Sequence, residues 1–423
     1  MALAEARSRR RGVASRRTYL SVVGYCGLLA VVVWWSWRAF HDPLTLDTGL
    51  AYQGGQVAWA TGHPEHVATW ISTPFLGAVM AVVSRVMSVN TAADLVTALN
   101  IACVIGCLVF VLRRLRSVLS PVWWWVASFA LVSYGPMMST VWWKQFNIFA
   151  LVLAIAGYEF VRTGRTKRGS ALIALSIAIK PLALLLPIVM LLRRGSRRAG
   201  LLAIAYTIAL NVVAQGFLAW RADSISALNV IPVLKLFAKR SNPSNIWACV
   251  PENFAPGSLL CRLFSGGEVG LEHVLVLGLV VLLGAWIFDA LRNRNPLSWE
   301  VFAFACAIST MISPIAWSHY QIMLAPLFLL LLVRFTTEGA SVGTWAGLLA
   351  AFVLASLMWQ PFGTLVSAVL GVTPGSATAL HQLSLVEEIA QFAQYILIVT
   401  GVMWFLRRDA FPARSTSLNP STG

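Results

Sequence analysis

The chain is organised around residues 40–74, FHDPLTLDTGLAYQGGQVAWATGHPEHVATWISTP. This stretch holds two aspartates, one glutamate and three of the six histidines of the chain, and it follows a strongly apolar run. Because its surroundings are apolar, we expect it to lie at one face of a membrane. Asp42, which precedes Pro43, suits the cap of a short interfacial helix. Asp47, followed five residues later by Tyr52, is the candidate functional carboxylate.

Composition predicts an all-α polytopic membrane protein. The 423 residues are 58% hydrophobic and only 11% charged, too few charges to cover the surface of a soluble protein. The net charge of +16 comes largely from arginines grouped in short segments between apolar runs. Such groups are typical of topology signals and of contacts with anionic membrane lipids, so no nucleic-acid partner is predicted.

The basic groups also predict the topology. A cytoplasmic N-terminus at 1–17 is followed by one membrane domain at 18–406 and a disordered cytoplasmic tail at 407–423. We expect about 12 helical passes, two of them short, with residues 74–87 lying in the outer interface. Spans are predicted at 18–39, 91–112, 121–139, 200–219, 273–291, 299–312, 318–334, 341–358 and 388–406, and a further span returns from the outer segment 140–147 to the basic group that begins at Arg162. The outer segments are 40–90, 140–147, 220–272 and 359–387.

Residues 169–192, GSALIALSIAIKPLALLLPIVMLL, lie between two basic clusters. With both ends in the cytoplasm, they predict a hairpin of two short helices that turns at Lys180-Pro181, because proline cannot donate to the preceding helical turn. Irregular backbone at membrane depth is tolerated only inside protein or beside a polar cavity. The hairpin therefore indicates a cavity.

The predicted topology brings several polar residues to the outer face. Ionisable groups in or beside membrane spans are costly and usually functional. Lys180 has the alternative of bonding a backbone carbonyl, and His319 that of an ordinary interfacial histidine. The candidate site residues are Asp47, Tyr52, Lys144, Gln145, Asn147, Lys180, Lys239, Arg240, Asn245 and His319.

Cysteine and histidine spacing predicts neither a metal site nor a cofactor. The six cysteines are scattered, and no CxxC pair or His/Cys ligand spacing occurs. Cys249 and Cys261 share one polar loop and would be able to pair in an oxidising compartment.

Several motifs together resemble glycosyltransferase family 87, GT-C-type enzymes that use polyprenyl-phosphate sugars. The family includes phosphatidylinositol-mannoside mannosyltransferases and an arabinofuranosyltransferase. The similar segments are DTGLAYQGGQVAWATG from Asp47, Thr73-Pro74, KQFN at 144–147, AIKPLALLLPIVMLLRR, NPSN at 242–245 and SPIAWSHY. Three positions depart from the family pattern: Thr73 replaces an aromatic residue, Lys144 replaces a glycine, and Tyr320 replaces a second histidine.

The resemblance implies a GT-C fold in the plasma membrane with its active site on the extracytoplasmic face. A sugar, mannose in the first instance or arabinose as the alternative, would move with inversion from a polyprenyl-phosphate donor to a membrane glycolipid or envelope glycan. Asp47 would be the general base. Lys180, His319, Lys239 and Arg240 would stabilise the phosphate, and Tyr52, Lys144, Gln145, Asn147 and Asn245 would bind sugar or acceptor.

A transporter or flippase of lipid-linked sugars is the alternative from another class. It explains the hydropathy, the broken hairpin and the cavity equally well. Against it, no inverted half-repeat is visible, and the polar loops are predicted on one face instead of at the midplane.

Overall fold

The computed structural model of this protein describes residues 2–41, 46–67, 72–192, 194–228, 297–312, 318–357 and 389–410, together with Ser258 and Gly284. Within these ranges every regular element is an α-helix or a 3₁₀ helix, as the composition predicts. Most of the predicted outer segment 220–272, the predicted span 273–291 except Gly284, and the late outer segment 359–387 lie outside the described residues.

Among the described residues, four helical segments are long and apolar enough to cross a membrane: Val22–His41 within α1 (Ala2–His41), α4 (Val89–Leu115), α10 (Arg197–Arg221) and Tyr320–Glu338. A fifth candidate joins α5 (Pro121–Val132) and α6 (Gly135–Trp142) to α7 (Asn147–Arg162), with a bend of 120° at the break. The described part is thus that of a polytopic membrane protein, whereas the count of about 12 passes stays a prediction.

The remaining described helices are shorter. Their bounds are α2 (Leu46–Thr61), η1 (Pro64–His66), α3 (Pro74–Val86), α8 (Thr166–Ile179), η2 (Pro181–Ala183), α9 (Leu185–Leu191), η3 (Arg194–Ser196), η4 (Ile225–Leu228), α14 (Trp299–Ile312), η5 (Ser318–Leu324), α15 (Ala325–Glu338), α16 (Val342–Leu357) and α19 (Phe392–Ala410). α3 is about 20 Å long at helical rise, less than the roughly 30 Å of a hydrocarbon core.

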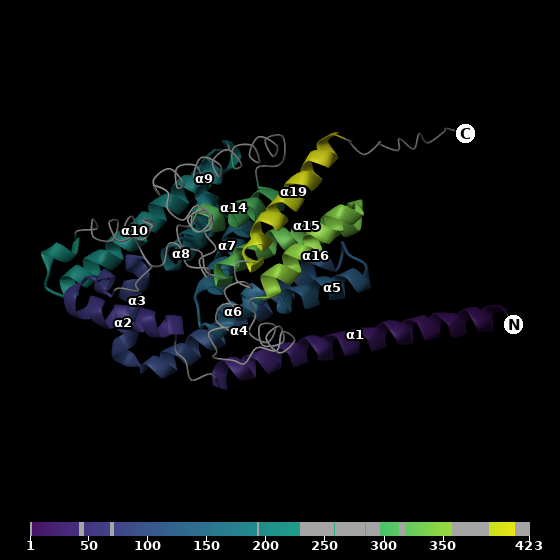
Figure 1. The fold of residues 1–423 in the computed structure, drawn as a ribbon, viewed down its shortest axis with the longest axis horizontal. Coiled ribbons are helices and arrows are strands. Elements are labelled where there is room, and N and C mark those ends of the chain that lie inside the picture. The colour runs from purple at the N-terminus through teal and green to yellow at the C-terminus, as the bar shows by residue number, and fades with distance from the viewer. Residues whose placement is uncertain are drawn as a thin grey trace.

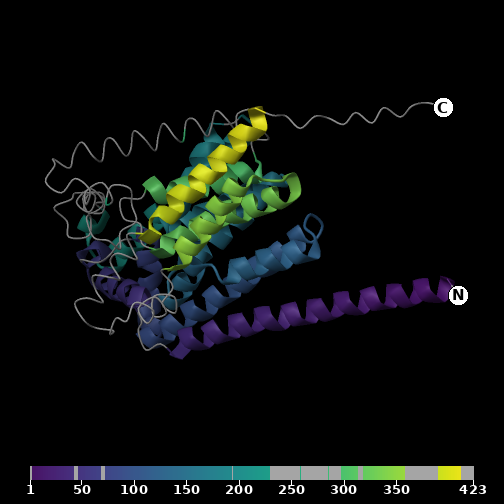
Figure 2. The ribbon, with the colours of Figure 1, turned by 45° about the vertical axis from the view of Figure 1, so that its right-hand side comes forward.

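The helices form one bundle with α2 and α3 at the end opposite the chain's N-terminus (Figure 1). α1 runs along one side, and its first turns project beyond the neighbouring helices in both ribbon views (Figure 2). One large apolar cluster joins α1 to α4–α9 and α14, and a second joins α5 to α14, α15, α16 and α19. Two small apolar clusters at the far end bind α2 to α3, α4 and α10.

Glycine allows α7 and α8 to cross at close range. Gly157 of α7 and Gly169 of α8 face each other so closely that a Cβ on either residue would strike the backbone of the other. Small residues are the usual means by which helices approach in membranes. This crossing holds α7 and α8 as an antiparallel pair, so the start of α7 and the end of α8 lie at the same end of the bundle.

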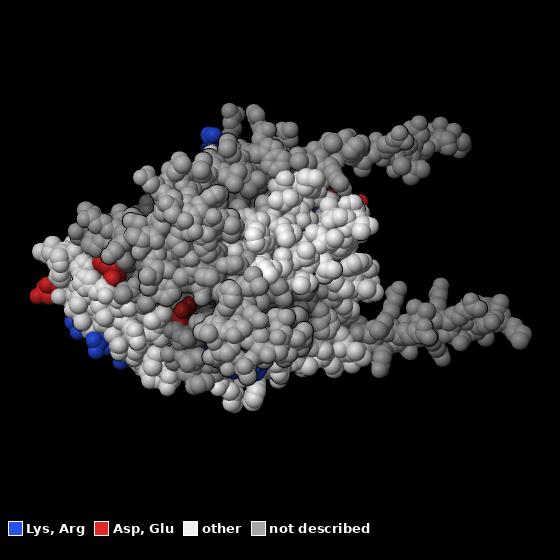
Figure 3. Space-filling view, viewed as in Figure 1, with Lys and Arg blue, Asp and Glu red and all other residues white. Residues whose placement is uncertain are grey.

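The described surface agrees with a membrane environment. In Figure 3 the broad described face over α15 and α16 is almost free of charged atoms, and the charged side chains in view lie mainly toward the end formed by α2 and α3. Large apolar side chains are exposed along α1, α4 and α10, including Leu29, Leu99 and Val213. In water such faces would be unfavourable, whereas in lipid they are the expected contact surface.

Candidate active site

The helix break after α8 is caused by residues next to it in the sequence. α8 ends at Ile179 because Pro181 has no N–H to continue the helix, as predicted. The last carbonyl oxygens of α8 therefore lack a helical N–H partner, and they accept hydrogen bonds from the segment before α3. The Ser72 hydroxyl donates to the Ile179 carbonyl at 3.2 Å, and the Thr73 hydroxyl donates to the carbonyl of Ala178. The break is therefore anchored to the start of α3.

The two arms around this break are unequal. α8 has 14 residues, whereas the return consists of the 3₁₀ turn η2 and the seven-residue α9. α10 packs along both arms, and α9 also packs against α14. Lys180, in extended backbone between the arms, thus projects from the turn itself.

Lys180 is a buried cation, with 8% of its surface exposed. Its Nζ donates to Gln145 Oε1 at 3.3 Å and lies 5.0 Å from the centre of the Tyr320 ring. Among the described residues no carboxylate oxygen comes within ion-pair distance of Nζ. A buried ammonium in this setting is partly compensated by the amide and the ring, and it retains capacity to attract an anion.

Asp47 is the second residue of α2, and its carboxylate is half-buried. Burial raises the pKa of Asp47, and the nearby Lys180 ammonium acts in the opposite direction, lowering that pKa. The structure thus brings the predicted base and the predicted phosphate ligand within electrostatic reach of each other. A carboxylate with a raised pKa is a stronger proton acceptor than an ordinary aspartate.

The turn between α6 and α7 supplies the third part of the site. Thr48 of α2 donates to the Lys144 carbonyl at 2.6 Å, and Asn100 of α4 donates to the Gln145 carbonyl at 2.8 Å. These two bonds fix the turn against both helices. Gln145 Oε1 faces Lys180, while its Nε2 is buried and has no partner among the described residues. A buried amide donor without a partner points to a ligand.

Lys144 occupies the left-handed backbone region, with φ of +52°. This conformation favours glycine, which stands at this position in the family pattern described above. Lys144 is also buried, as is Asn147 at the first position of α7. Both residues therefore lie at the predicted turn, next to Gln145.

The Tyr52 hydroxyl joins α2 to the end of α3. It donates to the Met87 carbonyl at 2.9 Å and to the Ser84 carbonyl at 3.3 Å. The Tyr52 ring lies in a small apolar cluster against which Phe146, the neighbour of Gln145, also packs. Its predicted role in binding sugar or acceptor stays a prediction.

Other predicted site residues lie outside the described part. Lys239, Arg240 and Asn245 fall there, as do Cys249 and Cys261. His319 lies in η5, of which only the backbone is described at that position. Its neighbour Tyr320 places η5 beside Lys180. In the described part of the chain no three His, Cys, Asp or Glu side chains cluster as metal ligands would.

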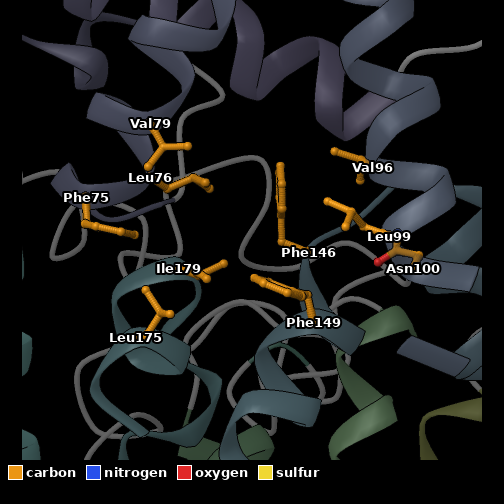
Figure 4. Close-up of a pocket in the computed structure, with 10 residues that line it drawn as sticks. All are labelled: Phe75, Leu76, Val79, Val96, Leu99, Asn100, Phe146, Phe149, Leu175 and Ile179. Carbon is orange, nitrogen blue, oxygen red and sulfur yellow. The ribbon is translucent and has the colours of Figure 1, made fainter. Parts of the chain in front are cut away.

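An apolar pocket of about 280 Å³ lies beside these polar residues (Figure 4). Part of its wall is formed by Phe146, which follows Gln145 in the sequence, and by Ile179, which precedes Lys180. The side chains in Figure 4 come from α3, α4, α7 and α8 and from the turn before α7, and most point toward a common space. The lining residues are Phe75, Leu76, Val79, Val96, Leu99, Asn100, Phe146, Phe149, Leu175 and Ile179.

The family model of glycosyltransferase family 87 matches residues 70–314, more than half of the chain. The matched range includes Lys144, Gln145 and Lys180, whereas Asp47 precedes it and His319 follows it. No curated protein and no solved structure matches the chain.

Proposed function

The chain belongs to glycosyltransferase family 87, which makes it a membrane glycosyltransferase, and we propose that it moves mannose from a polyprenyl-phosphate donor to a hydroxyl of a membrane glycolipid or envelope glycan. Arabinose is the alternative sugar. The observation that supports this proposal is the contact of Lys180 Nζ with Gln145 Oε1, together with the electrostatic interaction of Lys180 with Asp47. Phe146 and Ile179, the sequence neighbours of Gln145 and Lys180, line an apolar pocket. A lipid-linked phosphate sugar needs a base for the acceptor, a cation for the phosphate and an amide for the sugar hydroxyls, next to an apolar surface for the lipid.

In the proposed reaction Asp47 is the general base. The acceptor hydroxyl gives its proton to the Asp47 carboxylate while its oxygen attacks C1 of the sugar. The bond from C1 to the phosphate oxygen breaks on the opposite side, and the electron pair leaves with the phosphate. The sugar is therefore transferred with inversion. The raised pKa of Asp47 suits this role, because proton transfer is efficient when the base is not too weak.

Lys180 stabilises the leaving group in this proposal. The donor is a phosphodiester and the product is a phosphomonoester, so negative charge grows on the phosphate in the transition state. A pre-positioned ammonium facing that charge lowers the barrier without reorganisation. Since side chains can neutralise a monophosphate, the proposal needs neither metal nor cofactor. His319, Lys239 and Arg240 are proposed to assist from segments whose side chains lie outside the described residues.

Gln145 and Asn147 are proposed to bind hydroxyl groups of the sugar, as are Lys144 and Asn245. The support for Gln145 is its buried Nε2, which has no partner among the described residues. The first prenyl units of the donor are proposed to enter the pocket of Figure 4, since nearly all its lining side chains are apolar.

A direct assay tests this function. Purified protein in lipid is offered radiolabelled polyprenyl-phosphate mannose and polyprenyl-phosphate arabinose separately, with cell-envelope lipid as acceptor. We expect a labelled glycolipid from mannose. A product from the arabinose donor alone would change the proposed sugar from mannose to arabinose. No product from either donor would refute the proposed function and would leave the transporter as the better hypothesis.

The proposed site requires Asp47 and Lys180 to face the extracytoplasmic side. Single cysteines at positions 61, 165 and 195, in a chain without its native cysteines, test this with an impermeant reagent. We expect labelling from outside at 61 and not at 165 or 195. Labelling of position 165 from outside would reverse the topology and with it the side on which sugar is transferred.

A further inference from the structure

A second polar group lies at the end of α2 away from Asp47. The Trp59 ring contacts two arginines, Arg85 from the last turn of α3 and Arg221 from the last residue of α10. The guanidinium carbons are 5.2 and 4.3 Å from the ring centre. We call Trp59, Arg85 and Arg221 the Trp59 cluster. It joins the ends of three helices.

The positive charges of the Trp59 cluster are not balanced. Both arginines are exposed, and neither takes part in an ion pair with any described residue. Because both contact one ring, their guanidinium carbons are less than about 10 Å apart, within a Debye length at moderate salt. Two like charges held this close attract an anion, and guanidinium groups match the geometry of phosphate oxygens.

The surroundings of the cluster are those of a membrane interface. α10 is a candidate span, and the cluster lies at its last residue. Trp220 next to it is 76% exposed, and Val82 and Val86 are exposed on the same end of α3. Exposed tryptophan at the end of an apolar helix is typical of the lipid headgroup level, where arginines meet anionic lipids.

We propose that the Trp59 cluster binds the phosphate of an anionic phospholipid from the surrounding membrane. The headgroup phosphate lies between Arg85 and Arg221, and the acyl chains follow the exposed apolar side chains of α3 and α10. The bound lipid reduces the repulsion between the two arginines and thereby stabilises the packing of α2 on its neighbours. This site does not depend on the proposed sugar transfer.

Lipid-dependent melting tests the site. The purified full-length chain is heated in neutral micelles with added phosphatidylglycerol or phosphatidylcholine, and the difference in Tm between the two lipids is measured for each variant. We expect phosphatidylglycerol to raise the wild-type Tm by several degrees, and R85Q/R221Q to lose most of that gain. A merely structural role of the arginines would lower Tm equally in both lipids and would overturn the proposal.

A matched control removes two exposed arginines elsewhere. R113Q/R116Q takes the same charge from the basic group at the end of α4, where contacts with anionic lipid are not shaped by a ring, and we expect it to lose a clearly smaller part of the phosphatidylglycerol gain. Equal loss in this control would show bulk charge attraction and refute a built site. R85K/R221K keeps the charge without the planar fork, and we expect a partial gain.

The source of the phosphate is tested in the same system. Inorganic phosphate at equal concentration is expected to give little stabilisation, since it lacks acyl chains. If it stabilises as well as phosphatidylglycerol, the site takes free phosphate, and the lipid assignment is wrong. If only a glycolipid acceptor stabilises, the cluster is an acceptor site instead. In native mass spectrometry we expect R85Q/R221Q to show at least a tenfold weaker retention of one phosphatidylglycerol.

Discussion

At its first turn α2 presents Asp47 and Thr48 to the protein interior, whereas near its last turn it presents Trp59 to two exposed arginines. The two positions are about 18 Å apart along one helix. At the first, a carboxylate and a buried ammonium of opposite charge lie near an amide with an unused donor. At the second, two cations share one aromatic ring.

This difference separates two kinds of polar site in a membrane protein. A carboxylate and a buried ammonium are costly to bring together, and removing one leaves the other without its opposite charge. Such groups are usually functional, so changes at the Asp47 end should act on the reaction. Exposed like charges cost little folding free energy and interact mainly with the surrounding lipid headgroups and water. Changes at the Trp59 end should therefore act on the response to lipid. The predictions that follow test the Asp47 end in order of expected effect.

The largest effect is expected for Asp47→Asn. Asparagine keeps the size and much of the hydrogen bonding but cannot accept a proton. Loss of a general base typically lowers the rate by about 10²–10⁴-fold. We expect sugar transfer to fall by that amount while donor binding persists. Asp42→Asn is the control, because asparagine caps a helix as well as aspartate does. Full activity of Asp47→Asn would remove the distinction between the two ends of α2.

Lys180→Ala is expected to reduce turnover by about 10²-fold, the size of effect seen when one donor to a developing anion is lost. Lys180→Arg should keep part of the activity, because charge matters more than shape for a point contact. Turnover is measured in reconstituted protein, and monodisperse elution shows that each variant is folded. Normal turnover of Lys180→Ala would make Lys180 a structural residue.

The pH profile of kcat/KM tests whether Asp47 and Lys180 interact. Because burial raises the pKa of Asp47, the acid limb of kcat/KM should lie above the pH of about 4 expected for an ordinary aspartate. Lys180 lowers that pKa, so the residual activity of Lys180→Ala should show an acid limb at higher pH than wild type. Lys180→Arg should leave the limb near its wild-type position. An unchanged limb in Lys180→Ala would show that the two groups do not interact.

Local rules allowed the sequence to predict part of this site. Lys180-Pro181 predicts a helix break because the effect of proline is confined to one turn. The outer turn at 140–147 follows from another rule, because the basic groups at 113–116 and 162–168 are expected to place both ends of this run in the cytoplasm. The structure places Gln145 and Lys180 together because α7 and α8 pair through Gly157 and Gly169.

The long-range contacts could not be predicted in this way. Thr48 binds a carbonyl 96 positions away, and Asn100 binds one 45 positions away. Asn100 stands as an isolated polar residue in an apolar run, whereas Thr48 is one of several polar residues in 40–74, so the sequence identifies the partner of neither. Thr73 was interpreted as a departure from the family pattern, yet its hydroxyl satisfies the end of α8. Nor did the sequence indicate that the Tyr52 hydroxyl binds two carbonyls at the end of α3.

A smaller effect of Asp47→Asn concerns stability. A pKa raised on folding means that the ionised carboxylate is less favourable in the folded than in the unfolded state. The stability that the protonated form contributes is therefore lost as pH rises through the folded pKa. At pH 7 Asp47→Asn should thus melt no lower than wild type, and about 1–3 °C higher. A clear fall in Tm would mean that the charged form stabilises α2, as an acidic residue in a first helical turn can.

The smallest effect is expected at Lys144, where the backbone and the side chain make separate demands. The left-handed conformation costs a non-glycine residue about 1 kcal/mol, and glycine adopts it without that strain. Lys144→Gly should therefore keep the turn that positions Gln145, whereas Lys144→Ala keeps the strain and loses the side chain. If only the backbone matters, the Gly variant should match the wild-type rate and melt slightly above the Ala variant. If the lysine side chain binds the sugar, both variants should lose activity equally in the reconstituted assay. Equal turnover in all three proteins would show that the Lys144 side chain does not act on the sugar.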